Sequence, residues 1–215
     1  EIQSNVIYPV ENYGSSVAPF YTTLAIWVGA LILTAILKVN PNKKLFPDAN
    51  QVQLFFGRYL TFLFMTIVQT TVTVLGDLYL LEIQCPNPFR FWVAGVITGL
   101  TFSILIYSLV VAFQDVGKAL AVVMVVIQIA GSSGTYPIEL LPEFFQRVYI
   151  FFPFPYAINA MRECIGGMYG HNYVFYLVEL AIFIPVSLVI GLLLRKPLHG
   201  LTHYMEKRMR DTEMM

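Results

Sequence analysis

The sequence predicts an all-α integral membrane protein with five transmembrane helices and an outer re-entrant helical hairpin. Three observations lead to this fold class. Hydrophobic residues make up 57% of the 215 residues. Charged residues make up only 12%, against roughly 25% in soluble domains. Several stretches also approach the ~20 apolar residues that a helix needs to cross the hydrocarbon core of a bilayer.

The predicted spans cover residues 17–37, 59–81, 91–113, 119–133 and 174–194. In the first span, Tyr21 and Trp27 are expected near a membrane interface, where aromatic rings are enriched. In the third span, Gly95 and Gly99 form a GxxxG pair that allows close helix approach, although two incidental glycines are an equal alternative. Residues 1–16 are interpreted as the end of an extracellular region and residues 195–215 as a basic tail.

The most informative stretch runs from Gln128 to Cys164. It begins as an apolar helix and is interrupted by Gly and Ser residues at 131–134 and by four prolines, Pro137, Pro142, Pro153 and Pro155. Proline removes a backbone donor and disrupts a helix interior, so one spanning helix is excluded. The intervening residues are too apolar for a solvated loop. We therefore expect a re-entrant hairpin over residues 135–165, packed against protein because irregular backbone is tolerated at membrane depth only there or beside water.

The distribution of basic residues among the connections predicts the orientation of the chain in the membrane. One set of connections contains ten of them: Lys38, Lys43, Lys44, Arg58, Lys118, Arg195, Lys196, Lys207, Arg208 and Arg210. The other set contains Arg90, Arg147 and Arg162. The positive-inside rule places the first set in the cytoplasm. The N-terminal end and the hairpin then face outward, and an odd number of spans implies at least one further span upstream in a longer protein.

Two groups of polar residues are candidate sites. Polar groups in spans are costly and often functional, so Asp77, Arg162, Glu163 and Glu179 are interpreted as an outer polar vestibule. The alternative is that each lies singly in the headgroup region. On the inner side, residues 49–59 could form a short amphipathic helix that docks a cytoplasmic partner, or one that lies on the membrane with nothing bound. The candidate coupling residues are Lys43, Lys44, Gln51, Phe55 and Arg58.

The rest of the sequence contains few residues or motifs that indicate a chemical function. Cys85 and Cys164 both fall on the predicted outer side, where a disulfide is permitted, with two unpaired thiols as the alternative. His199 and His203 share a helical spacing, but no third ligand is apparent and no metal site is expected. The sequence contains no G-x-x-x-x-G-K-[ST], HExxH or GxSxG motif, so we expect no enzyme activity and no cofactor. There is no basic patch with interleaved aromatics, so no nucleic-acid partner is expected.

Two blocks carry a resemblance to a known family. The block IQIAGSSGTYPIELLPEFFQ from Ile127 and the block NYGSSVAPFYTTLAIWVGALIL from Asn12 cover about a fifth of the chain. The broken stretch resembles that of type-2 ABC exporter permeases, and the match is closer for the C-terminal membrane domain of the YhgE/Pip group, the phage infection proteins. The positions that match the re-entrant signature are Gly134, Pro137, Pro142, Pro153, Tyr156 and Arg162.

The resemblance implies more than composition does. It implies an upstream span, a large extracellular region, a homodimer, and a loop between the first two spans that meets a cytoplasmic ATPase subunit. Members of the group have been linked to phage adsorption and related proteins to secretion machinery. Two hypotheses follow. The first is a permease subunit that moves an amphipathic or lipid-like substrate outward, and the second is a membrane anchor or receptor that transports nothing.

Overall fold

The computed structural model describes residues 10, 12–39, 47–132, 134 and 138–194, and these form helices joined by loops, with no strand among them. The α-helices are α1 (Tyr13–Ile36), α2 (Gln51–Tyr79), α3 (Pro88–Phe113), α4 (Asp115–Gly131), α5 (Glu143–Val148), α6 (Phe154–Gly166), α7 (Asn172–Ala181) and α8 (Phe183–Val189). Shorter turns are the 3-10 helices η2 (Ile138–Leu140) and η3 (Tyr149–Phe151) and the π-helical η4 (Ile190–Leu194). The predicted all-α membrane fold is confirmed.

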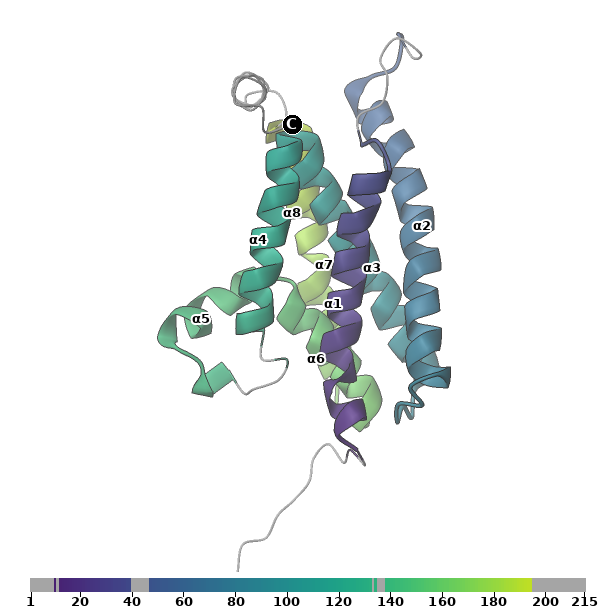
Figure 1. Ribbon diagram of the computed structural model, residues 1–215, viewed down its shortest axis with the longest axis vertical. Coiled ribbons are helices and arrows are strands. Elements are labelled where there is room, and N and C mark those ends of the chain that lie inside the picture. Colours follow the sequence, from purple (N-terminus) through teal and green to yellow (C-terminus); the bar gives the residue numbers. More distant parts are fainter. Residues whose placement is uncertain (1–9, 11, 40–46, 133, 135–137, 195–215) are drawn as a thin grey trace, which may run out of the picture.

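Four helical segments of the described chain are long and apolar enough to cross a membrane: α1, α2, α3 and the run Asn172–Leu193. The predicted span 119–133 corresponds to α4, which has 17 residues. At 1.5 Å per residue α4 is about 26 Å long, slightly less than the ~30 Å hydrocarbon core. The predicted number of five spans therefore depends on α4, which lies alongside the long helices in Figure 1.

The helices run alternately up and down between two ends of the bundle (Figure 1). The start of α1, the α2–α3 connection, α6 and the start of α7 lie at the lower end in that view. The end of α1, the start of α2 and the α3–α4 turn lie at the upper end. After α4 the chain passes through α5 and α6 and returns to the end from which α1 starts. This is the path that the proline-rich stretch predicts.

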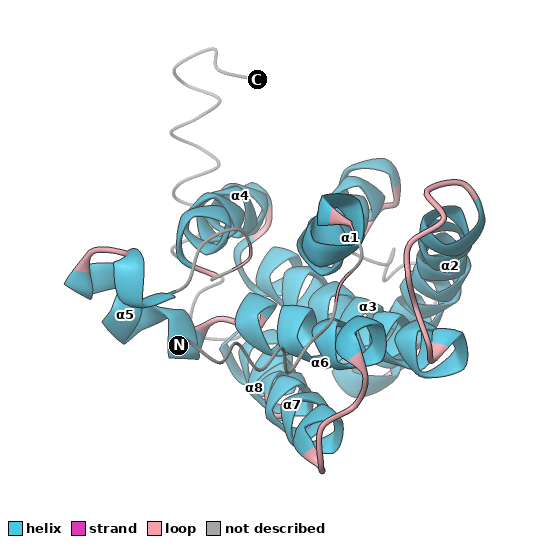
Figure 2. Ribbon diagram, turned by 90° about the horizontal axis from the view of Figure 1, so that it is seen from below, coloured by secondary structure: helices cyan, strands magenta, loops and turns pink. Residues whose placement is uncertain are grey.

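Helix α3 is the centre of the bundle. It contacts α1, α2, α4, α6, α7, α8 and η4, and Figure 2 shows it enclosed by the other helices when viewed along the bundle. Three fully buried rings join α1, α3 and α6: the centroid of Trp27 lies 5.0 Å from that of Phe102 and 5.5 Å from that of Phe154. Trp27 is therefore a core residue, and its predicted place at a membrane interface was wrong. Its indole Nε1 donates to the carbonyl of Ala121 in α4.

The GxxxG pair of α3 sits against α2. A Cβ atom on Gly99 would lie 2.6 Å from Oγ1 of Thr70 and 3.0 Å from Cγ2 of Thr66. A Cβ atom on Gly95 would lie 3.0 Å from Cγ2 of Val74. The predicted close approach is confirmed, and it occurs between two helices of the same chain, where small residues let the backbones come together.

Candidate functional site

The prolines of the broken stretch lie at the joints between its helical pieces. Pro142 is the N-cap of α5, Pro153 is the N-cap of α6, and Pro155 lies in the first turn of α6. At these positions the missing backbone N–H would have had no partner inside the helix. These prolines thus lie at the starts of helical pieces and not inside a long helix. Pro137 lies outside the described residues.

The other signature residues tie the stretch to its surroundings. The guanidinium of Arg162 on α6 donates through Nη2 to the carbonyl oxygen of Gly134, 2.9 Å away. A Cβ atom on Gly134 would lie 2.1 Å from Cδ2 of Phe20 on α1, so only glycine fits against this ring. The hydroxyl of Tyr156 donates to the carbonyl of Ile150 at 2.8 Å. These contacts fasten the break after α4 to both α6 and α1.

A partly polar cavity of about 400 Å³ lies beside this junction, between the first turns of α1, the C-terminal half of α6, and α7. Its size is typical of small-molecule sites. The lining residues are Val10, Ser15, Ser16, Pro19, Asn159, Arg162, Glu163, Ile165, Gly166 and Tyr176. Both a guanidinium and a carboxylate therefore border it. The elements that form the cavity meet at the lower end of the bundle, as Figure 2 shows from below.

The two charged residues of the cavity are held in place by hydrogen bonds. Glu163 is only 2% exposed, and its Oε2 accepts from the backbone N–H of Tyr169 at 2.8 Å. Arg162 also donates through Nη1 to Oδ1 of Asn159 at 3.4 Å. Buried charges need such partners because an isolated charge in a low-dielectric interior is costly. The fixed side chains present a guanidinium and a carboxyl group to the cavity.

The structure divides the predicted vestibule. Arg162 and Glu163 line one cavity, but Asp77 contacts α1 elsewhere, and Glu179 is exposed on α7. The lining residues Ser15, Ser16, Asn159 and Tyr176 are ones that sequence reasoning missed. For Asn159 a signal existed, since it precedes Arg162 and Glu163 by three and four residues and so shares their face of α6.

The predicted coupling segment differs from expectation. Residues 51–59 are the first turns of α2 and form no separate helix, because the helix continues without interruption to Tyr79. Phe55 is 2% exposed, and its ring packs 5.0 Å from that of Tyr107, so it faces the core and not a partner. Gln51 is exposed, and Nε of Arg58 donates to the carbonyl of Lys38 at 2.6 Å. Lys43 and Lys44 lie outside the described residues.

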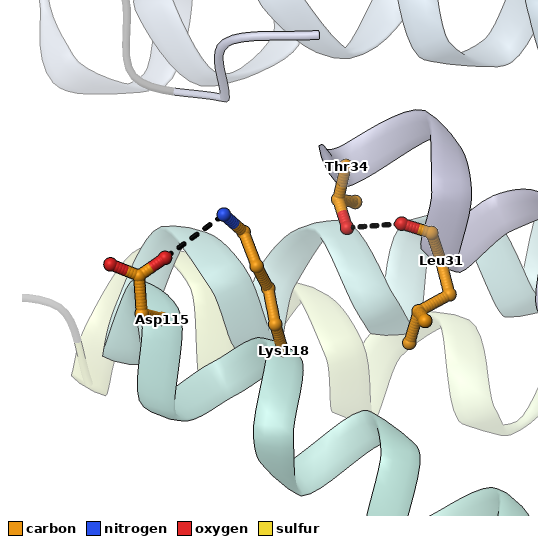
Figure 3. Close-up of polar contacts among 4 residues, drawn as sticks. All are labelled: Leu31, Thr34, Asp115 and Lys118. Carbon is orange, nitrogen blue, oxygen red and sulfur yellow. Dashed lines mark hydrogen bonds and ion pairs between the residues drawn. The ribbon is translucent and has the colours of Figure 1, made fainter. Parts of the chain in front are cut away.

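A second polar cavity, of about 380 Å³, lies at the opposite end of the bundle, between the end of α1 and the α3–α4 turn. Lys118 and Asp115 line it and form an ion pair with 2.9 Å between Nζ and Oδ1 (Figure 3). Thr34, across from them on α1, donates to the carbonyl of Leu31 at 2.7 Å (Figure 3). Polar recesses thus occur at both ends, with the buried middle of α3 between them.

The two cysteines are adjacent but not bonded. Both are free thiols, and the Sγ of Cys85 donates to the carbonyl of Cys164 at 3.6 Å. Burial raises the pKa of Cys85. Burial, with Cys85 close by, raises the pKa of Cys164 to about 12. The pairing that the sequence allows is absent here, although the α2–α3 connection and α6 bring its two members together. His199 and His203 lie outside the described residues, within which no group of His, Cys, Asp or Glu could hold a metal ion.

The described chain is a helical membrane bundle in which a broken, folded-back stretch lies beside a partly polar cavity. A family model described as "ABC-2 family transporter protein" matches residues 2–193, and the chain belongs to this family. It is a multi-pass protein of the plasma membrane with a permease-like role. The family supplies the membrane component of transporters and not, in general, an enzyme.

Among individual proteins, the chain is similar to one described as "Uncharacterized protein YhgE" from Bacillus subtilis (strain 168). The two are 28% identical over 170 residues, which cover 79% of this chain and 22% of that protein. The family match and this relative support the resemblance to the YhgE/Pip group. The chain spans about a fifth of the length of this relative. No solved structure matches this chain.

Proposed function

We propose that this chain is the permease domain of an exporter that works as a homodimer and moves an amphipathic or lipid-like substrate outward. The observation that carries the proposal is the polar cavity bordered by Arg162 and Glu163, directly beside the folded-back α5–α6 stretch. An amphiphile needs a place where its polar head is satisfied while its apolar part stays in hydrocarbon. The cavity offers a guanidinium, a carboxyl group and hydroxyls within a bundle that exposes many large apolar side chains.

The geometry also supports a route for mechanical coupling. Helix α2 runs unbroken over 29 residues from the exposed Gln51 to Tyr79, a length of about 44 Å. A force applied at its first turns by a cytoplasmic ATPase would be carried along one rigid element. Its tight contact with Gly95 and Gly99 would pass the movement to α3, and α3 packs on α6. The cavity wall and the hairpin would then move together.

A reconstitution experiment tests transport. The full-length protein and any ATPase that co-purifies with it are placed in vesicles, and movement of a fluorescent short-chain phosphatidylglycerol between leaflets is followed with ATP. We expect Arg162→Gln to lower the ATP-dependent rate at least tenfold, because the cavity loses its positive charge. The matched control is Arg147→Gln, which removes an exposed arginine of the hairpin that pairs with the neighbouring Glu143. Equal rates for both variants and the wild type would contradict the proposed role of the cavity.

An anchor or receptor without transport is the second candidate. It is favoured by the share of the relative that this chain covers, since 22% leaves most of such a protein outside the matched region. Reversal of charge at the predicted inner face, with Lys43→Glu, Lys44→Glu and Arg58→Glu combined, separates the two. A motor-driven permease should lose ATP-dependent transport. If the protein is an anchor, the triple variant should keep phage adsorption or assembly of its secretion complex at wild-type level. Neither the wild type nor the variant should then transport substrate.

A further inference from the structure

Asp77 is a buried carboxyl group that the cavity does not include. It lies in the last turn of α2 and is 8% exposed. Its Oδ2 lies 2.5 Å from the hydroxyl oxygen of Thr22 on α1, which is 2% exposed. The contact joins α1 to α2 at the end of the bundle that also carries α6 (Figure 1).

The hydroxyl of Thr22 has two neighbours and one proton. Its Oγ1 lies 2.8 Å from the carbonyl oxygen of Ala18 as well as 2.5 Å from Asp77. A threonine hydroxyl donates once and accepts up to twice, and a carbonyl oxygen or ionised carboxylate only accepts. If Asp77 were ionised, one hydrogen would have to serve two acceptors. If Asp77 carries a proton, it donates to Thr22, which donates in turn to Ala18, and each contact has its own hydrogen.

The charges around Asp77 also oppose a carboxylate. The C-terminal end of a helix bears partial negative charge from its last carbonyls. Among the described residues no lysine, arginine or histidine forms an ion pair with Asp77. The titratable groups of α2 and of the segments packed against it are Tyr13 and Tyr21 on α1, Arg58, Tyr59 and Tyr79 on α2, Glu82 and Cys85 in the connection, and Arg90 and Tyr107 on α3.

None of these groups offers Asp77 a counter-charge. Arg58 is at the opposite end of α2 and donates to the carbonyl of Lys38. Arg90 directs its Nη1 to the sulfur of Met168. A lone buried carboxylate is costly in a low-dielectric site, and a carboxyl group there relieves the cost by taking up a proton.

We propose that Asp77 is a proton-binding site that latches α2 to α1 through the hydrogen-bond chain Asp77–Thr22–Ala18. When the proton leaves, the O–H bond of the carboxylic acid breaks, its electron pair stays on the carboxylate, and water takes the proton. The chain then loses a donor and the interface between α1 and α2 acquires a buried charge. The proposal does not depend on the exported substrate or on transport at all.

The sign of the pH dependence follows from proton counting. An unfolded aspartate releases its proton near pH ~3.9, so at neutral pH the native state would hold one more proton than the unfolded state. Stability then falls as pH rises from the ionisation of the unfolded aspartate to that of native Asp77, and it is level at higher pH. Asp77→Asn supplies an amide that donates to Thr22 and never ionises, so its stability should lack this component.

Infrared spectroscopy of the full chain in lipid nanodiscs at neutral pH tests the proposal. We expect a carbonyl stretch of a buried carboxylic acid that disappears in Asp77→Asn and remains in the control Glu82→Gln, which removes an exposed acid at the same end. In Thr22→Val the band should move to higher frequency, because its hydrogen-bond acceptor is gone. This variant also carries the test if Asp77→Asn does not fold. A spectrum that is unchanged in Asp77→Asn, or in Thr22→Val, would overturn the proposal. So would a Tm that shows the same pH dependence in wild type and Asp77→Asn.

Discussion

Substitution of Gly134 by alanine tests whether the break after α4 is seated against α1. The added Cβ would lie 2.1 Å from Cδ2, 2.7 Å from Cγ and 2.9 Å from Cε2 of Phe20. This ring is 5% exposed and packs at 5.3 Å on Tyr21, so it cannot move aside freely. Overpacking of this kind costs about 1–3 kcal/mol. For a chain of this size the melting temperature should fall by about 2–12 °C.

The assay is thermal unfolding of the purified protein in detergent, followed by intrinsic tryptophan fluorescence. Gly57→Ala is the matched control, because a Cβ at Gly57 meets nothing within 4 Å and alanine favours a helix. Phe20→Leu combined with Gly134→Ala is the rescue, because it removes the ring that the new methyl group strikes. The double variant should be more stable than the sum of the two single effects predicts.

Two results would refute this reasoning. If Gly134→Ala has the same melting temperature as the wild type, Gly134 is not packed on Phe20 in the native protein. If the single variant is destabilised but Phe20→Leu gives no rescue, the cost comes from backbone conformation and not from the contact. In either case the fastening of the break to α1 would have to be abandoned.

Three further predictions concern other parts of the chain. Gly117→Ala should lower the Tm more than Gly134→Ala, because its Cβ would lie 2.3 Å from a backbone carbonyl oxygen of α3, which cannot rotate away. With a pKa of about 12, Cys164 should stay a protonated thiol at neutral pH and react with maleimide more slowly than the partly exposed Cys85. Its rate should rise steadily with pH, as mass spectrometry would show. Glu143→Gln breaks an exposed ion pair on α5 and should change stability by less than about 0.5 kcal/mol, a change that denaturant titration can bound.

The membrane fold was predictable because it depends on composition and on backbone chemistry. Few charges and long apolar runs are incompatible with water and suit a bilayer. Prolines cannot occupy the middle of a spanning helix, and Pro142 and Pro153 do lie at the starts of α5 and α6. Glycines spaced by four allowed close packing, and Gly95 and Gly99 do pack closely on α2.

The candidate site was only half predictable. Arg162 and Glu163 were identified by their charge in an apolar stretch, but the same argument selected Glu179, which is exposed, and Asp77, which faces Thr22. Phe55 was assigned to a partner surface and lies in the core. A helix that is apolar on all sides has no polar stripe to distinguish its outward face from its inward one, so the direction of each side chain was undetermined.

The sequence by itself determined that the chain is a helical membrane protein with a helix interrupted near Gly131 and folded back through prolines. This was possible because the cost of moving a charged side chain from water into lipid, and the missing backbone N–H of proline, are properties of single residues. Only the tertiary structure decided which polar groups share a cavity, that Trp27 and Phe55 are core residues, and that Asp77 meets Thr22. Those outcomes depend on how helices rotate and pack against one another, and in a uniformly apolar bundle that rotation is set by contacts between segments far apart in the chain.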